Sequence, residues 1–300
     1  MEFLVNSTEP TKQKTALCIA IVFADKKLSD FAKELDTRSK GALSDILKKG
    51  DISGNFEQVL LLHNIPNITA ERVLLVGAGK KSDFTEKKYI NLCKTIFKFL
   101  KQQNISDCVF NVDDFIVTSK DTRWKIHQAV FSFNTINYSF NNYKSNLGSN
   151  SKNDNNLDKL KKITFAVTSK NQKYAKTAID EANAIIQGKD YTKDLANTPP
   201  NVCDPEYFAS EAKKLAKKYS NLKTTILNEK ELKELKMGAL LAVGQGSNSK
   251  SKLVVMEYNG KNKSSPTKPI VFVGKGITFD TGGQSLKPSA AMHGMKYDMC

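Results

Sequence analysis

Two lysines and two aspartates lie close together in one stretch of the sequence, as Lys275, Asp280, Lys287 and Asp298. Carboxylates suit divalent cations, whereas a lysine ligates a metal only as the neutral amine, which requires burial beside strong positive charge. A second lysine that is not a ligand could polarise a substrate carbonyl beside the metal. Weakly paired ions on a solvated loop are the commoner origin of such charges, so both interpretations stay open at this point.

The backbone around these charges favours a site. Lys275 is flanked by glycines, and Asp280 is followed by Thr281 and the pair Gly282 and Gly283. Glycines allow close approach of a ligand and positive φ angles. The apolar run 269–273 precedes them and predicts a buried strand. At the carboxyl end of a strand in an open α/β sheet, side chains leave the core and line a crevice.

The rest of the chain alternates apolar runs with helical periodicity, which predicts an α/β fold with a mixed or parallel sheet. Strands are expected at 15–23, 56–63, 72–76, 105–112, 163–168, 223–227 and 253–258. Helices are expected at 28–35, 41–48, 85–103, 121–134, 173–195 and 229–236. After the helix that ends before Pro199, Asp204 is expected to cap the next helix, with Pro205 at its first position.

A polar, low-complexity segment, 141–158, interrupts this alternation and predicts a flexible connection between domains. The expected domains are therefore residues 1–150, an N-terminal α/β domain ending in that connection, and residues 151–300. The turn GAGKKS at 77–82 lacks the full glycine pattern of a Walker or dinucleotide loop, so we expect an ordinary strand-to-helix turn there, without chemistry.

Composition narrows the class of protein. The 300 residues are 40% hydrophobic and 26% charged, as in soluble globular proteins, with no apolar run long enough to span a membrane and no evident secretory signal. Five cysteines without paired spacing fit buried free thiols in a reducing compartment. These features predict a cytoplasmic protein without a membrane partner.

The net charge of +15 is typical of proteins that bind nucleic acid, so nucleic acid must be considered as a partner. However, only three of the 46 basic residues are arginine, whose planar guanidinium group is preferred for bidentate hydrogen bonds to phosphate and guanine. Specific nucleic-acid binding is therefore not expected. The three histidines are far apart and form no His-Glu-x-x-His motif. Any metal bound by these residues must therefore be held by carboxylates and lysine.

The segments VGKGITFDTGGQSLKP and MKYDMC together closely resemble the signature of the leucyl aminopeptidase family, the dinuclear metallo-exopeptidases also called cytosol aminopeptidases. The resemblance is strong from 193 to 300 and architectural before that. It implies that Lys275 and Asp298 bind one metal ion, that Asp280 bridges two, and that Lys287 is catalytic. Gln284 and His293 depart from the usual residue types, at positions that are not ligands in the family.

The resemblance also implies the fold, the reaction and the assembly. A macro-like N-terminal domain would precede the first part of a mixed-sheet α/β metallopeptidase domain. Two divalent ions, manganese or zinc, would serve release of unblocked N-terminal residues, preferentially leucine, from peptide substrates by a homo-hexamer. The family's later motif Asn-Thr-Asp-Ala-Glu-Gly-Arg, with two further carboxylate ligands, does not occur here, so we expect an N-terminal fragment that is inactive alone.

The residues themselves leave two alternative functions open. One is a kinase-like phosphate site, because the sequence DTGG also occurs where glycines approach phosphate, although no convincing companion phosphate loop precedes it. The other is a nucleic-acid-binding regulator on a peptidase scaffold, which would require one contiguous basic groove.

Overall fold

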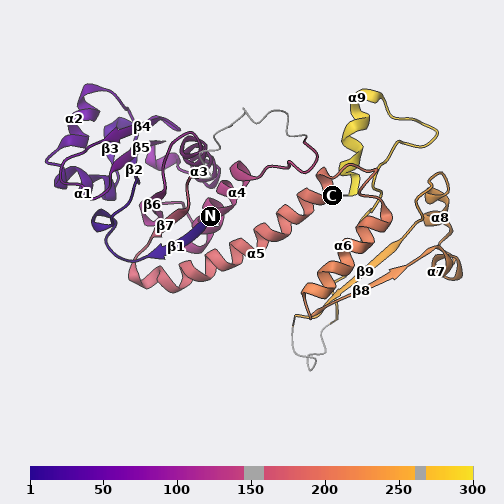
Figure 1. Cartoon of the computed structure of the whole chain (residues 1–300). Helices are drawn as coiled ribbons and strands as arrows, with labels where there is room; N and C mark the ends of the chain where they lie inside the picture. Colours follow the sequence, from indigo (N-terminus) through magenta and orange to yellow (C-terminus); the bar gives the residue numbers. More distant parts are fainter. Residues whose placement is uncertain (145–158, 261–267, 300) are drawn as a thin grey trace. The chain divides into compact units, whose positions relative to one another are not determined.

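The computed structural model describes residues 1–144, 159–260 and 268–299, and the chain divides into two compact units, Met1–Gly188 and Lys189–Cys300 (Figure 1). Each unit is described by itself below. No helix within the described ranges is both long and apolar enough to cross a membrane.

Unit 1 is built on a seven-stranded mixed sheet. Along the sheet the strands are β1 (Glu2–Asn6), β7 (Lys162–Ala166), β6 (Asp107–Asn111), β2 (Cys18–Phe23), β5 (Arg72–Gly79) and β4 (Val59–His63), with β3 (Lys27–Leu28) beside β2. The pairs from β1 to β5 are parallel, whereas β4 runs antiparallel to β5 and β3 to β2. The expected mixed α/β sheet is confirmed.

Helices cover both faces of this sheet. They are α1 (Asp30–Arg38), α2 (Ala42–Lys49), α3 (Glu86–Lys101), α4 (Thr122–Asn137) and α5 (Gln172–Asn197), the last of which begins in unit 1 and ends in unit 2. Because successive side chains of a strand point to opposite faces, β2 contributes Ile19 and Ile21 to one core and Cys18, Ala20 and Val22 to the other.

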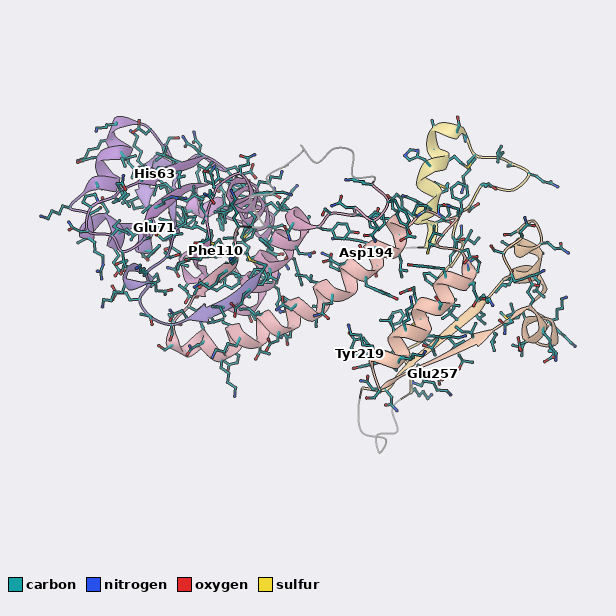
Figure 2. All side chains as sticks on the ribbon, viewed as in Figure 1. His63, Glu71, Phe110, Asp194, Tyr219 and Glu257 are labelled. Carbon is teal, nitrogen blue, oxygen red and sulfur yellow. The ribbon has the colours of Figure 1, made fainter. Side chains whose placement is uncertain are left out.

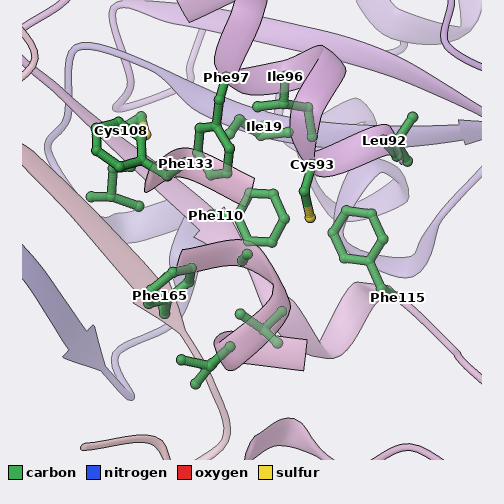
Figure 3. Packing of buried hydrophobic residues seen from close by; sticks show 14 of the residues in the cluster. Ile19, Leu92, Cys93, Ile96, Phe97, Cys108, Phe110, Phe115, Phe133 and Phe165 are labelled. Atoms are coloured by element: carbon green, nitrogen blue, oxygen red, sulfur yellow. The ribbon is translucent and has the colours of Figure 1, made fainter. Parts of the chain in front are cut away.

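The larger core lies between the sheet and α3, α4 and α5 and is rich in aromatic rings. Figure 3 shows Phe110 of β6 among Phe97, Phe115 and Phe165. The rings of Phe110 and Phe115 stack with centroids 5.1 Å apart, and Phe165 meets Phe110 edge-on at 5.9 Å. The smaller core packs α1 and α2 against the opposite face. A sheet covered on both faces accounts for the continuous apolar runs in the sequence.

The first unit extends beyond the expected boundary near residue 150. Strand β7 follows the polar segment, yet it lies between β1 and β6 in the sheet of unit 1, paired in parallel with both. Backbone hydrogen bonds on both edges therefore hold it in the first unit, which ends at Gly188. Residues 145–158, which include most of the expected connection, lie outside the described residues.

The cysteines of the described residues behave as the sequence predicts. Cys18, Cys93, Cys108 and Cys203 are buried free thiols. Burial in apolar surroundings disfavours the thiolate, and it raises the pKa of Cys93 to about 12. These side chains therefore act as core residues rather than as reactive groups.

Unit 2 contains a two-stranded antiparallel sheet with short helices around it. Its elements are α6 (Pro205–Lys218), β8 (Leu222–Leu227), α7 (Glu229–Glu234), α8 (Gly238–Gly244), β9 (Leu253–Tyr258), α9 (Ser289–Met292) and a 3-10 helix, His293–Met299. As predicted, Asp204 caps α6, accepting a hydrogen bond from the Tyr207 N–H, and Pro205 occupies its first turn. Glu257 of β9, labelled in Figure 2, pairs with Lys223 of β8 at 3.4 Å.

The predicted buried strand at Pro269–Val273 is wrong for this structure. The run has no strand assignment, and the side chains of Phe272 and Val273 are 91% and 93% exposed. A strand needs a neighbour to satisfy its backbone groups. Among the described residues of unit 2 the strands β8 and β9 pair only with each other, and neither adjoins this run.

Candidate metal centre

Lys275 joins the two aspartates of the candidate site. Its Nζ lies 2.9 Å from Oδ2 of Asp280 and 2.5 Å from Oδ2 of Asp298, although the two aspartates are separated by 17 residues of sequence. The ammonium group therefore stands between two carboxylates, in the position a cation would take. The structure brings together the three residues to which the family resemblance assigns metal binding.

Lys287 approaches the same carboxylate from another direction. Its Nζ lies 3.2 Å from Oδ2 of Asp280, and it donates to the backbone oxygen of Asp280 at 3.1 Å and to Sδ of Met295 at 3.1 Å. It makes no ion pair with Asp298 among the described contacts. Lys275 thus bridges both carboxylates, whereas Lys287 contacts only the Asp280 carboxylate of the two.

Neighbouring charges shift the pKa values of Asp280 and Lys275 in opposite directions. The nearby Lys275 ammonium, the Gly282 N–H and the Lys287 ammonium together hold the pKa of Asp280 far below its usual range. The carboxylates of Asp298 and Asp280 raise the pKa of Lys275 above its usual value. Without a metal ion, Asp280 is a carboxylate and Lys275 an ammonium ion at neutral pH.

The loop between Asp280 and Lys287 is shaped by its glycines. Gly282 has a φ of +92° and donates its N–H to Oδ1 of Asp280 at 2.9 Å, and Gly283 has a φ of +70°. The backbone N–H of Lys287 donates to the Thr281 oxygen at 2.9 Å and closes the loop. Left-handed φ angles at two successive positions explain why the sequence has a glycine pair there.

The segment carrying Asp298 is fixed to the end of α5 by a residue that the sequence analysis missed. Tyr297 donates its hydroxyl to Oδ1 of Asn197 at 3.0 Å, and Lys296 donates to the backbone oxygen of Asn197 at 3.2 Å. Asn197 lies within 193–300, the part of the sequence that strongly resembles the family, and this resemblance was the available signal. These contacts hold the residues immediately before Asp298.

The donor set fits a divalent cation only in part. Oδ2 of Asp298 is buried, and its partner is the Lys275 ammonium group at 2.5 Å. Two carboxylates and one lysine amine are suitable ligands for such an ion. Within the described ranges no cluster of three or more His, Cys, Asp or Glu side chains completes a coordination shell.

Comparison with protein-family models gives two matches. Residues 190–300 match the model described as the cytosol aminopeptidase family, catalytic domain, and residues 19–147 match the N-terminal domain of the same family. The catalytic-domain match begins next to Lys189, where unit 2 begins, and it contains all four residues of the site.

Individual proteins agree with the family models. The chain is 44% identical to a probable cytosol aminopeptidase of Thioalkalivibrio sulfidiphilus and 42% identical to one of Aliivibrio fischeri, in each case over 100% of this chain and 59% of the relative. The chain thus spans about three fifths of the length of the curated relatives it matches.

Solved structures show the same fold. A mutant of tomato leucine aminopeptidase is similar with a TM-score of 0.71 at 24% identity, over 100% of this chain and 56% of that one. The bottromycin maturation enzyme BotP in complex with Mn is similar with a TM-score of 0.69 at 21% identity, over 95% of this chain and 53% of that one. The two family models together cover more than half of the sequence, and the chain belongs to the cytosol aminopeptidase family.

Proposed function

We propose that the protein is a metal-dependent aminopeptidase that releases unblocked N-terminal residues, preferentially leucine, from peptides. The observation that carries this proposal is the meeting of Lys275, Asp280 and Asp298 around one cation position, with Lys287 beside it. The match of residues 190–300 to the catalytic domain of a peptidase family supports the reaction class. The kinase-like and nucleic-acid-binding alternatives receive no support from that match.

Lys275, Asp280 and Asp298 are the residues that would hold divalent ions, manganese or zinc, with Asp280 shared between two ions. Bound there, the ions would supply Lewis-acid activation of water and of the scissile carbonyl. Lys275 must then lose its proton, because an ammonium group has no lone pair for a metal. Asp280 needs no such change, since it is already ionised at neutral pH.

Lys287 has a different role in the proposal. It contacts Asp280 without bridging the two carboxylates, so its ammonium group remains a hydrogen-bond donor. A preorganised cationic donor beside the reacting carbonyl stabilises the negative charge that develops on its oxygen. The contacts of its Nζ to the Asp280 backbone oxygen and to Met295 hold the side chain at this position.

The test is a chimera in which residues 1–300 are joined to the part of the Thioalkalivibrio sulfidiphilus relative that this chain does not match. We expect the purified chimera with added Mn²⁺ or Zn²⁺ to hydrolyse leucine p-nitroanilide and to leave an N-acetylated leucine substrate intact. Loss of turnover in EDTA and its return with metal are expected as well. A folded chimera with a full metal complement and no aminopeptidase turnover contradicts the proposal.

The 300-residue chain is the matched control. Because its described residues supply only two carboxylates and one amine, we expect it to bind metal weakly and to show no turnover. Metal-dependent release of leucine by this chain alone would contradict the assignment of an incomplete donor set.

We also propose a cytoplasmic homo-hexamer for the protein at the length of its relatives. Buried free thiols suit a reducing compartment, and the relatives are named as cytosol aminopeptidases. Sedimentation velocity of the chimera should give one species of six chains. A monomer with full activity would count against the hexamer.

A further inference from the structure

The 3-10 helix His293–Met299 contacts both lysines of the metal centre. Its Asp298 pairs with Lys275, and Sδ of its Met295 accepts a hydrogen bond from Lys287. The helix is only seven residues long, and the hydrogen bonds within a 3-10 helix have poor geometry. Its position in unit 2 therefore depends on contacts with other elements.

Two neighbouring residues of this helix contact Asn197, the last residue of α5. The hydroxyl of Tyr297 donates to Oδ1 of Asn197 at 3.0 Å, and Nζ of Lys296 donates to the backbone oxygen of Asn197 at 3.2 Å. Nζ of Lys296 also lies 5.1 Å from the ring centroid of Tyr297. The last backbone oxygens of a helix lack partners within the helix and carry partial negative charge, so a lysine ammonium group is a suitable partner there.

The chain around Asn197 is well fixed. Thr198 is 4% exposed, and it donates both its N–H and its hydroxyl to the backbone oxygen of Asp194, at 3.0 Å and 2.7 Å. Pro199 and Pro200 follow, and their rings restrict the backbone that leaves the helix. The end of α5 is therefore a firm support for the contacts of the 3-10 helix.

The two contacts of Asn197 depend on different atoms. Lys296 binds the backbone oxygen, which any residue at this position would offer. Only the contact with Tyr297 requires the amide side chain of Asn197. Because Tyr297 is 45% exposed, packing alone does not fix its side chain, and the hydrogen bond of its hydroxyl does. Tyr297 directly precedes Asp298 in the chain.

We propose that Asn197 is a positioning residue of the metal centre, which acts through Tyr297 to hold Asp298 where it can bind a metal ion. This inference rests on the proposed function, in which Asp298 is a metal ligand. Loss of the Asn197 side chain allows the 3-10 helix to move. Asp298 then spends less time beside Lys275, and metal affinity falls. Outer groups that orient metal ligands commonly affect affinity in this way.

The experiment measures the Mn²⁺ affinity of the 300-residue chain by electron paramagnetic resonance of the free ion. Asn197→Ala and Tyr297→Phe each remove one partner of the same hydrogen bond, so each should weaken binding about threefold to tenfold. The double variant should bind Mn²⁺ no more weakly than either single variant, because the bond is already lost. Asn197→Asp keeps an oxygen that accepts the bond and should bind within about twofold of the parent chain.

Tyr219→Phe and Asn221→Ala are the matched controls. Both residues are exposed, and neither takes part in a described contact with the 3-10 helix, so both variants should bind Mn²⁺ like the parent chain. Hydrogen exchange of the metal-free chain is a second readout. The amides of residues 293–299 should exchange faster in Asn197→Ala and in Tyr297→Phe than in the controls, whereas the amides of α6 should not change.

Asp298→Asn distinguishes failure of this inference from failure of the proposed function. If Asp298→Asn abolishes Mn²⁺ binding and Asn197→Ala leaves it unchanged, the metal centre stands and the positioning role is wrong. If neither variant changes Mn²⁺ binding, both are wrong. Additive losses in the double variant, or weaker binding without faster exchange at 293–299, would also overturn the positioning role. Tyr297→Phe removes a single oxygen atom and keeps the test decisive if Asn197→Ala does not fold.

Discussion

Gly282 lies directly against the backbone of Ser285: a Cβ atom placed on Gly282 would be 2.5 Å from the Ser285 carbonyl oxygen. The same atom would lie 3.1 Å from Cγ of Lys287, and the φ of +92° at Gly282 is itself unfavourable for other residues. The turn that connects Asp280 to Lys287 therefore closes only with glycine at this position.

Gly282→Ala in the active chimera is expected to lower kcat/KM at least about tenfold. The added methyl must displace backbone, and left-handed φ costs an L-residue roughly 1–2 kcal/mol. Gly283→Ala is the matched control, since Gly283 also has a positive φ, +70°, but has nothing within 4 Å of an added Cβ. Its loss should be clearly smaller, and equal losses in kinetic assays of the two variants would argue against the close approach.

The position of β7 predicts where unit 1 can be cut. A chain of residues 1–188 is expected to unfold cooperatively in urea, because it retains the strand between β1 and β6. A chain of residues 1–152 lacks this strand, so β1 loses its described partner and β6 loses one of two. It should show no cooperative transition by circular dichroism. Equal stability of the two chains would contradict the assignment of β7 to the first unit.

Much of the fold could be predicted from the sequence, because many of its helices and strands follow local patterns of apolar residues. The helix expected at 85–103 becomes α3, whose apolar stripe of Leu92, Ile96 and Leu100 is fully buried. The cap of α6 by Asp204 needs only neighbouring residues. Strand β1 was not expected, since its pairing with β7 joins residues that are 160 apart in sequence, such as Glu2 and Lys162. No local pattern encodes such a contact.

The candidate site, too, could be predicted only in part from the sequence. Its four charged residues were identifiable from their types and from a family resemblance, and the structure brings them together. The hydrogen bond between Tyr297 and Asn197 joins residues that are 100 positions apart in the sequence, so the periodicity of the sequence could not predict it. The predicted strand at Pro269–Val273 is wrong for a related reason. An apolar run indicates that a segment could form a buried strand, but a strand also needs a neighbouring strand to pair with.

Burial raises the pKa of Asp114 in unit 1, whose carboxylate accepts hydrogen bonds from the Ser29 hydroxyl and the Phe31 N–H. A carboxyl whose pKa is higher in the folded than in the unfolded chain gives its full contribution to stability below the unfolded pKa, and loses it as pH rises through the folded pKa. The stability of the parent chain minus that of Asp114→Asn should therefore fall in urea titrations as the pH rises above about 4, the usual pKa of an unfolded aspartate. A difference that rises with pH would contradict the sign.

The most direct test of the proposed site compares Lys275→Ala with Lys287→Ala in the chimera, by metal analysis and kinetics on the same preparations. Lys275 bridges both carboxylates, so its loss should lower metal occupancy, and excess metal should restore part of the activity. Lys287→Ala should keep near-normal metal content while kcat falls by on the order of 10²–10³, the cost of removing one oxyanion donor. If Lys287→Ala loses metal while Lys275→Ala retains it, the two assigned roles are wrong.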